Sequence, residues 1–547
     1  MAWTIKQMKQ TPFDFPLILL FFGAIGGLAI AVDKSLAWPS FFAIFSGFAW
    51  YFFLSRADLK LTILIIVSWL LMGSGVLLSG YFIIEYRSLG NALKLNLIGL
   101  IGNWLSAPFP QWKFFLIDPN SLGSYLDGIF FLSIGVVITE NRKKLRILAK
   151  CCLILITMGI FLSASRGSWL SCLTALILWM VMKRETARTS IAAVLTLGCT
   201  ISFYIFLVGS TSVNNVPFIG KILADLFVRP DRLEVYMNSL DLIRDMPLTG
   251  IGLGGQFPLI YSRYELIINV PFLYYSHHMF LESWLELGLI GAAWWSGLAI
   301  TLIYEGFFVF KKKAPIFQPV LVGIIAIFIH GLSDARPFVD LWCWIPFFSL
   351  AGIYSSSRTE KYSPIKQKYI HSTFIAFAFF LLMISTLFLK GPAIKVNMAT
   401  LLQQEADLGL NFTESERSMK RGEAAGLFLD ALKIDPTNRT SLSRLGLIAL
   451  ENGKYLEAIN YLERAFQIDP SHPGVRKTLG FAYLWEDKLD QASPLLIGVP
   501  NIVEELNYWG WYFGHKGVPG LGANAYELSL RFNPDQPEII GYLEKLK

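Results

Sequence analysis

The chain has 547 residues, of which 54% are hydrophobic, 15% aromatic and only 16% charged, and its mean hydropathy is +0.50. This composition is too apolar for a soluble protein of this length and predicts an integral membrane protein. The formal charge of +7 does not indicate nucleic-acid binding, because the basic residues gather in short runs between apolar segments, where they orient a chain in a membrane. The five cysteines lie in or beside apolar segments without metal-type spacing, and we expect small core residues at Cys151, Cys152, Cys172, Cys199 and Cys343.

Long apolar segments follow one another through the first 392 residues. A helix that crosses a membrane needs about 20 mostly apolar residues. The sequence therefore predicts an all-α polytopic membrane bundle of roughly eleven spans, or twelve at most. The first span has no small-residue cleavage pattern after it, so we expect it to be retained. The predicted spans lie near residues 15–32, 37–54, 61–84, 121–139, 145–163, 168–183, 189–209, 284–310, 316–334, 338–354 and 372–392.

Basic residues in the connecting loops predict the orientation of the bundle. If the spans alternate and segment 95–110 does not cross, the basic loops share one face with the N-terminus, which the positive-inside rule makes cytoplasmic. Four regions then lie on the opposite side: residues 85–120, the turn at Arg166, the long loop 210–283 and everything after about residue 393. The basic residues are Lys6, Lys9, Arg56, Lys60, Arg142, Lys143, Lys144, Arg146, Lys183, Arg184, Arg188, Lys311, Lys312, Lys313, Lys361, Lys366 and Lys368.

Residues 393–547 are predicted to form a separate domain, because apolar runs stop there and amphipathic helical patterns replace them. The string IDPTN at 434–438 recurs as IDPSH at 468–472, which is the 34-residue period of tetratricopeptide repeats. We expect about three repeats and a degenerate fourth that ends at RFNPDQP. Such an array binds peptides or a partner protein, or it serves as a rigid spacer or oligomer contact. The positions that fit the repeat are Ala424, Phe428, Ala431, Pro436, Leu445, Gly446, Ala458, Ala465, Pro470, Leu479, Gly480, Tyr483 and Ala492.

Two arginine sites lie on the non-cytoplasmic side. Arg166, in FLSASRGSWL, stands between two adjoining spans, where a guanidinium needs an anion or else anchors a helix end by snorkelling. Arg229 and Arg232 open a segment of the long loop whose apolar stripe, Leu233 to Ile243, predicts an amphipathic helix. Arginine matches phosphate oxygens bidentately, so both sites suit a phosphate-bearing amphiphile.

The glycines after this helix match the pattern G-x-G-x-x-G at Gly250, Gly252 and Gly255. A helix precedes them instead of a strand, so a dinucleotide site is excluded. We expect a tight turn through which backbone approaches a ligand or a neighbouring helix.

A histidine pair stands at the mouth of the next span, in SHHMFLESWLELG. Histidine titrates near neutrality and can act as a base. His278, Glu282 and Glu286 are four residues apart and share one helix face, where a carboxylate can orient an imidazole. The alternative is that the histidines lie in the headgroup layer and the glutamates pair with basic groups.

These segments together resemble the superfamily of O-antigen ligases and polymerases, which are polytopic glycosyltransferases. The resemblance rests on SRGSWL, on RLEVY followed by PLTGIGLGGQF, on HHMFLESWLELGLIG, and on IDPNSLGSYL at 117–126, and it extends over about residues 60–355. Three positions depart from the family pattern. Tyr236 stands where the family usually has Trp, Asp118 replaces the histidine before Pro119 and Asn120, and His278 occupies the usual Asn position.

The resemblance implies inverting, metal-independent glycan transfer from an undecaprenyl-diphosphate-linked donor to an acceptor hydroxyl, without a cofactor. His277 would be the base, although His278 is the alternative, and Arg166 and Arg232 would hold the diphosphate. Arg229, Tyr236, His278, Glu282, Asn120 and Gly252 would contact the substrates. The implied location is the inner membrane of a bacterial cell, and the partners would be the lipid-linked donor, a glycan, lipid or protein acceptor, and a protein bound by the repeats.

Alternatives to a ligase stay open, both among glycosyltransferases and in other classes of protein. A ligase caps a different acceptor, whereas a polymerase extends a second lipid-linked chain. A transporter, the rival of another class, would have inverted repeats and charged groups at mid-bilayer, but here the charged groups gather at one face. A scaffold without catalysis would explain the repeats but leaves the two arginines and His277 without a role.

Overall fold

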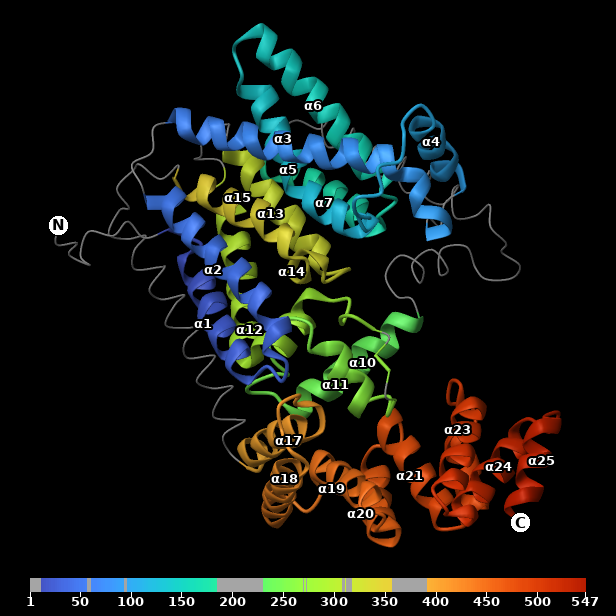
Figure 1. Cartoon of the computed structure of the whole chain (residues 1–547). Helices are drawn as coiled ribbons and strands as arrows, with labels where there is room; N and C mark the ends of the chain where they lie inside the picture. The colour runs from blue at the N-terminus through green and yellow to red at the C-terminus, as the bar shows by residue number, and fades with distance from the viewer. Residues whose placement is uncertain are drawn as a thin grey trace. The chain divides into compact units, whose positions relative to one another are not determined.

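The computed structural model describes residues 11–56, 61–92, 96–183, 230–268, 270–271, 273–306, 310, 317–356 and 391–547. All regular elements in these residues are helices (Figure 1), as the sequence predicts. The chain divides into two compact units, which are described separately. Unit 1 comprises Met1–Met237, Gly252–Gly255 and Tyr275–Phe379, and unit 2 comprises Asn238–Ile251, Gln256–Tyr274 and Phe380–Lys547. Two segments of the predicted outer loop thus group with the repeat domain.

Unit 1 contains the apolar helices. They are α1 (Asp14–Ile30), α2 (Lys34–Arg56), α3 (Leu61–Glu85), α4 (Asn96–Ser106), α5 (Pro119–Thr139), α6 (Lys143–Leu162), α7 (Arg166–Lys183), α12 (Met279–Tyr304), α13 (Phe317–Gly331), α14 (Arg336–Val339) and α15 (Trp344–Ser356), with 3-10 turns at Tyr86–Ala92 and Leu341–Cys343. Within the part of the chain that the structure describes, five stretches are long and apolar enough to cross a membrane: Lys34–Arg56, Thr62–Leu89, Pro119–Thr139, Lys143–Leu162 and Met279–Tyr304. The number of spans stays a prediction, because 189–209 and all but the last two residues of 372–392 lie outside the described residues.

The helix α4 lies in the segment that was expected not to cross. Its 11 residues rise about 16 Å, roughly half the thickness of the hydrocarbon core. The topology inferred from the basic loops depends on such a short element at this point.

Small residues let the helices of unit 1 approach one another. A Cβ on Gly323 of α13 would lie 2.8 Å from the carbonyl oxygen of Gly128 in α5, and one on Gly123 would lie 2.8 Å from Ser168 in α7. Close approach through glycine and serine is typical of helices packed in a membrane. The helix α13 accordingly packs against both α5 and α7 (Figure 1), and this packing fixes the end of α13, where polar groups gather.

Four cysteines fall in the described residues, and all are free thiols: Cys151, Cys152, Cys172 and Cys343. Cys343 is buried and Cys172 is partly buried, as expected of small core residues, whereas Cys151 is exposed on α6. Cys199 lies outside the described residues.

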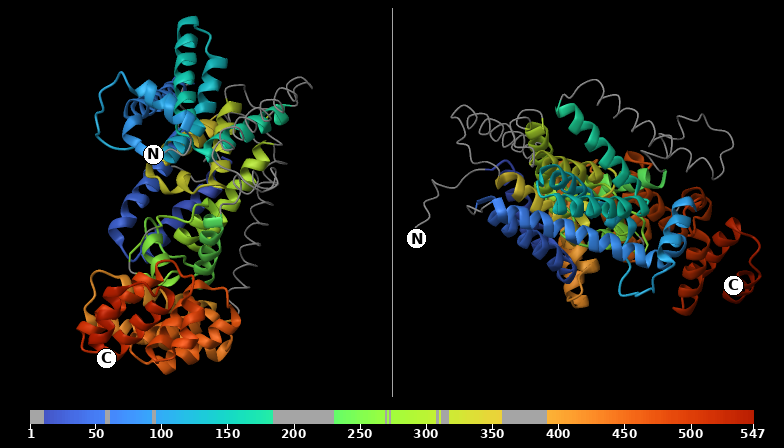
Figure 2. Two further views of the ribbon diagram at one scale, coloured as in Figure 1. Left: turned by 90° about the vertical axis from the view of Figure 1, so that its right-hand side faces the viewer. Right: turned by 90° about the horizontal axis from the view of Figure 1, so that it is seen from above.

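Unit 2 contains the predicted repeats as successive helix pairs (Figure 2). The pairs are α17 (Ala393–Leu408) with α18 (Glu414–Ile434), α19 (Arg439–Glu451) with α20 (Tyr455–Ile468), α21 (Pro473–Trp485) with α22 (Leu489–Leu496), and α23 (Ile502–His515) with α24 (Pro519–Phe532), followed by α25 (Pro537–Leu546). Gly446 and Gly480 stand where a Cβ would come within 2.4 Å of Leu462 and 2.6 Å of Leu496, so the small residues of the repeat pattern do permit close packing within each pair.

The outer-loop segments of unit 2 begin in the helix α10 (Pro230–Asp245), which confirms the helix predicted there, and continue in α11 (Phe257–Tyr264). The second half of α10 buries polar groups as well as apolar ones, because Asp245 accepts hydrogen bonds from Arg439, Thr440 and Arg444 of the repeat array. Ion pairs between Arg263 and both Asp407 and Glu451 join α11 to the same array.

Candidate functional site

The turn between α13 and α14 brings several polar groups of unit 1 together. His330, at the end of α13, accepts backbone hydrogen bonds from Ser333 and Asp334 at 2.9 and 3.0 Å, which closes the turn. Asp334 also accepts a hydrogen bond from the backbone N–H of Arg336 at 3.2 Å. The Asp334 side chain is only 5% exposed, so a buried negative charge is held at a fixed position between two helices.

Arg232, from the first turn of α10, reaches this turn. Its Nη1 donates to the backbone oxygen of Ser333 at 2.6 Å, and its Nη2 lies 3.4 Å from Oδ2 of Asp334. The guanidinium has five donors, and its side chain is 31% exposed. Part of its hydrogen-bonding capacity therefore faces outward, where an anion can reach it.

His277 lies beside the same carboxylate. Its Nδ1 is 3.8 Å from Oδ2 of Asp334 and has no hydrogen-bond partner among the described residues. The backbone of His277 has a φ of +58°, which is strained for a residue with a bulky side chain and typical of functional positions. Tyr236 donates to its carbonyl oxygen at 3.3 Å, and the ring of Tyr275 lies 4.3 Å from the imidazole. The imidazole is thus held by its neighbours, with its side chain 25% exposed.

The charges around Asp334 keep its carboxylate ionised. Burial alone would raise the pKa of Asp334, but the adjacent His277 ring and the positive charge of Arg232 outweigh burial and lower it. A carboxylate that stays ionised next to an imidazole stabilises the imidazolium form when the ring takes up a proton.

His278 has a different role from its neighbour. It is the N-cap of α12, where its Nδ1 accepts the backbone N–H of Phe280 at 3.2 Å, and burial lowers its pKa. Glu282 was expected to orient an imidazole, but its carboxylate accepts the backbone N–H of Ser276 at 2.6 Å. Asp334 is the carboxylate next to His277, so Glu282 shapes the loop before α12 instead.

Arg166 is the first residue of α7, immediately after a tight turn in which Ala164 has a φ of +49°. The next residue, Gly167, lies against the turn described above: a Cβ there would be 2.8 Å from both Oγ of Ser333 and Nε2 of His330. The start of α7 is therefore held against the turn that also carries Asp334 and receives Arg232.

A buried polar network anchors this arrangement. The Asp127 carboxylate of α5 pairs with Nδ1 of His330 at 2.6 Å and accepts hydrogen bonds from Ser168 and Ser171 of α7. Asp127 and His330 are fully buried. Charged groups inside a membrane bundle persist only when they are paired, and this pair ties α5, α7 and α13 together directly behind the turn.

The IDPNSL element also reaches the turn, through Arg336. Asp118 caps α5 by accepting from the backbone N–H of Asn120 at 2.9 Å, and it pairs with Arg336 at 3.4 Å. Arg336 further donates to Ser121 at 3.2 Å and to the Tyr275 hydroxyl at 2.7 Å. Asn120 is half-buried in the first turn of α5.

Gly252 takes the second of the two roles expected for it. Its φ is +103°, and a Cβ there would lie 2.6 Å from the Cα of Ala31, so the turn approaches a neighbouring helix. The adjacent Leu253 donates its backbone N–H to Gly27 of α1 at 3.0 Å. Arg229 lies outside the described residues.

Two comparisons with known proteins bear on this site. Residues 151–296 match the O-antigen ligase family. This range contains Arg166, Arg232 and His277 and ends before Asp334. The tetratricopeptide repeat family matches residues 449–510, within the helix pairs of unit 2. A search of the curated proteins found no match. The resemblance predicted from the sequence is confirmed, and it indicates a membrane function of the O-antigen ligase or polymerase type, with glycosyltransferase-like activity on a lipid-linked glycan.

Sequence reasoning missed two residues that the structure places at this turn, Asp334 and Arg336. A signal for them was present. The alternation of spans puts the end of segment 316–334 on the same side as Arg166 and His277, and SDARP is the only charged string there before the next apolar segment. Charged residues on that side are candidates for function on the same grounds as Arg166.

Proposed function

We propose that this chain transfers a glycan from an undecaprenyl-diphosphate-linked donor to an acceptor hydroxyl, with inversion and without a catalytic metal. The observation that carries the proposal is the convergence of His277, Arg232 and the Arg166–Gly167 start of α7 on the turn that holds Asp334. These segments are far apart in the sequence. They bring an imidazole, a carboxylate and the guanidinium group of Arg232 to one turn, beside the start of the helix that Arg166 opens.

His277 is the proposed general base. Its Nδ1 faces Asp334, so the tautomer with the proton on Nδ1 leaves Nε2 free to accept the proton of the acceptor hydroxyl. The acceptor oxygen then attacks the anomeric carbon from the side opposite the diphosphate, the new C–O bond forms, and the bond from that carbon to the diphosphate oxygen breaks. Asp334 balances the imidazolium that results.

Arg166 and Arg232 are proposed to bind the diphosphate. Its negative charge grows as the bond to the sugar breaks, and a guanidinium already in position stabilises that charge most in the transition state. Arg232 suits this role because its position is fixed by Ser333 and Asp334 while its side chain stays partly exposed.

The membrane topology belongs to the same proposal. The chain would lie in the inner membrane of a bacterial cell with the N-terminus cytoplasmic and the repeats outside, crossing the membrane roughly eleven times. The repeat unit would recruit an acceptor protein or an assembly partner, since helix-pair arrays present extended binding surfaces.

The test is transfer by purified protein from a matched undecaprenyl-diphosphate glycan with EDTA present. We expect His277→Asn to reduce the rate about 10²–10⁴-fold, because a general base contributes this much. Arg166→Ala and Arg232→Ala should each reduce it about 10²–10³-fold. His278→Asn is the matched control, because asparagine also caps helices, and it should stay within about tenfold of the unmodified chain.

The product size separates the two related activities. A single added glycan on a different acceptor indicates a ligase, and a ladder of lengthening lipid-linked chains indicates a polymerase. Equal loss at His277 and His278, or full activity of His277→Asn, would refute the assignment of the base. Donor binding without turnover by any acceptor would favour a transporter or scaffold.

A further inference from the structure

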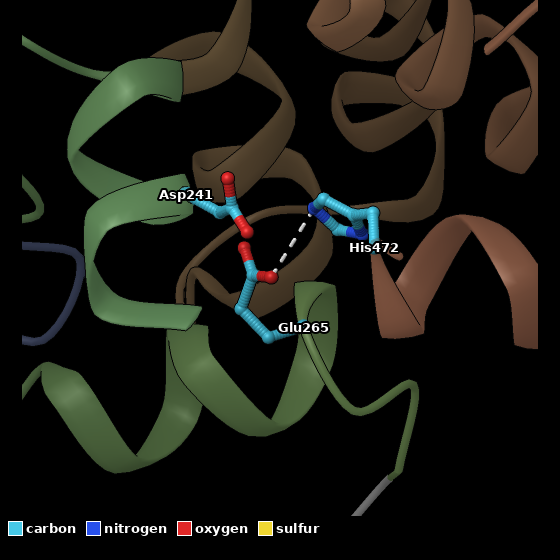
Figure 3. A group of neighbouring side chains, drawn as sticks. All are labelled: Asp241, Glu265 and His472. Carbon is cyan, nitrogen blue, oxygen red and sulfur yellow. Dashed lines mark ion pairs between the residues drawn. The ribbon is translucent and has the colours of Figure 1, made fainter. Parts of the chain in front are cut away.

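A second group of titratable side chains lies in unit 2 and shares no residue with the site proposed for transfer. Asp241 belongs to α10, Glu265 is the C-cap of α11 and His472 is the N-cap of α21. The three side chains point toward one another (Figure 3), and one ligand atom of each lies within 4.8 Å of the others. All three residues are buried.

Glu265 is the residue that this arrangement leaves unsatisfied. It is 1% exposed, and neither carboxylate oxygen has a hydrogen-bond partner among the described residues. Nε2 of His472 lies 3.3 Å from Oε2. An unsatisfied buried carboxylate is unfavourable, so the site requires a further group.

The surrounding charges show what that group must supply. The carboxylates of Asp241, Asp245 and Glu265 are buried around the site and outnumber the guanidinium groups of Arg439 and Arg444 that pair with them, of which Arg444 is buried and Arg439 is 10% exposed. Arg244 also pairs with Asp241, but its side chain is 64% exposed. The buried group is thus short of positive charge.

The backbone brings these ligands together closely. A Cβ on Gly474, in the first turn of α21, would lie 2.7 Å from the carbonyl oxygen of Tyr264 and 3.1 Å from that of Glu265. The start of α21 therefore packs directly on the end of α11. This contact holds His472 and Glu265 at their separation, as a preformed site requires.

We propose that Asp241, Glu265 and His472 bind one divalent transition-metal ion that fastens α10 and α11 to the repeat array. Two carboxylates and an imidazole suit Zn²⁺ or Mn²⁺, whereas Ca²⁺ and Mg²⁺ prefer oxygen ligands alone. Burial raises the pKa of the Glu265 carboxyl, so a proton competes with the ion for this site.

Two neighbours set the strength of binding. Nδ1 of His472 accepts the backbone N–H of Val475 at 3.2 Å, so coordination through Nε2 requires the other tautomer and gives up one capping hydrogen bond. Arg439 lies 3.6 Å from Asp241 but directs its shorter interaction, 3.0 Å, to Asp245. Both features weaken the ion's hold without blocking a ligand atom of Glu265.

The test uses the full-length protein in detergent, stripped of metal and then equilibrated with Zn²⁺. We expect the unmodified chain to bind one equivalent more than Glu265→Gln and His472→Asn. His515→Asn, at an exposed histidine of the same unit, is the matched control and should bind as much as the unmodified chain. Hydrogen exchange should show that Zn²⁺ slows exchange in α10, α11 and the first turn of α21 in the unmodified chain alone.

A second comparison guards against variants that simply fold poorly. In chelator, Glu265→Gln should be at least as resistant to unfolding as the unmodified chain, because it removes an unpaired buried charge; with Zn²⁺ the order should reverse. Equal Zn²⁺ binding by all four proteins would overturn the proposal. The proposal would also be overturned if, in chelator, the unmodified chain were more stable than Glu265→Gln. That result would mean that a proton shared with Asp241 satisfies Glu265 without a metal ion.

The inference does not depend on the proposed function. Glu265→Gln lacks the metal site but keeps His277, Arg166 and Arg232, so transfer by this variant in EDTA tests the metal-free reaction separately. Loss of Zn²⁺ binding with retained transfer supports both proposals, and each can fail without the other.

Discussion

Asp334 in unit 1 and Asp245 in unit 2 are equally buried, with side chains 5% exposed, yet their surroundings differ. Asp245 accepts hydrogen bonds from Thr440, Arg444 and Arg439 at 2.6, 2.9 and 3.0 Å. The basic groups beside Asp334 are more distant: Nη2 of Arg232 lies at 3.4 Å and Nδ1 of His277 at 3.8 Å. Asp245 is held by close hydrogen bonds, and Asp334 has longer contacts to its basic neighbours.

The exposure of the basic partners follows the same division. Arg444 is 4% exposed and also packs over the Tyr264 ring, whereas Arg232 is 31% and His277 25% exposed. A buried carboxylate with several close hydrogen bonds fixes structure, and one with longer contacts to partly exposed groups is able to respond to a charge that arrives with a substrate. The difference distinguishes a structural ion pair from a candidate site more clearly than burial does.

The same substitution at both aspartates tests this division, and the larger effect is expected in unit 2. Asp245→Asn should destabilise unit 2 by about 3–5 kcal/mol, because Arg439 and Arg444 stay buried while their carboxylate charge is lost. Hydrogen exchange in the full chain should show the loss in α10 and α19. Unchanged protection in those helices would mean that the network contributes little and that the comparison fails.

Asp334→Asn should instead spare stability and slow the reaction. The rate of glycan transfer should fall on the order of 10²-fold, because the imidazolium of His277 loses the charge that balances it. Ser333→Ala is the control, since it keeps the backbone oxygen that Arg232 contacts. A variant with normal transfer and a strongly destabilised unit 1 would place Asp334 in the same structural class as Asp245.

The pH dependence of stability gives a second test of Asp334. The pKa of Asp334 is lower in the folded chain than in the unfolded one, so unfolding takes up a proton. Its contribution to stability is therefore complete above about pH 4 and is lost as the pH falls through the folded-state value. Thermal unfolding between pH 5 and 3 should show a steeper decline for the unmodified chain than for Asp334→Asn.

Much of the molecule was predictable because it rests on local patterns. The apolar segments, the helix at 230–245 and the 34-residue repeat follow from residue spacing. Arg166 and His277 were singled out by their place at the ends of apolar segments and Arg232 by its place at the start of an amphipathic helix, and the roles of all three stay predictions. Asp334 was missed because its place in the candidate site depends on contacts with residues 57 and 102 positions away in the sequence. The partner of Glu282 was not predictable either, because helical spacing places this residue on a face but does not show that Ser276 folds back onto it.

A third carboxylate, Glu416, extends the comparison to an exposed residue. It forms a capping box at the start of α18, in which Thr413 accepts the backbone N–H of Glu416 at 3.3 Å and donates its own to the carboxylate at 2.7 Å. Thr413→Ala should destabilise α18 by about 1 kcal/mol, measured as faster exchange in its first turn. Glu416→Gln should have a smaller effect, because glutamine also closes a capping box. If Glu416→Gln destabilised α18 more than Thr413→Ala, an exposed charge would contribute as much to stability as a buried one. The contrast between Asp245 and Asp334 would then need another cause.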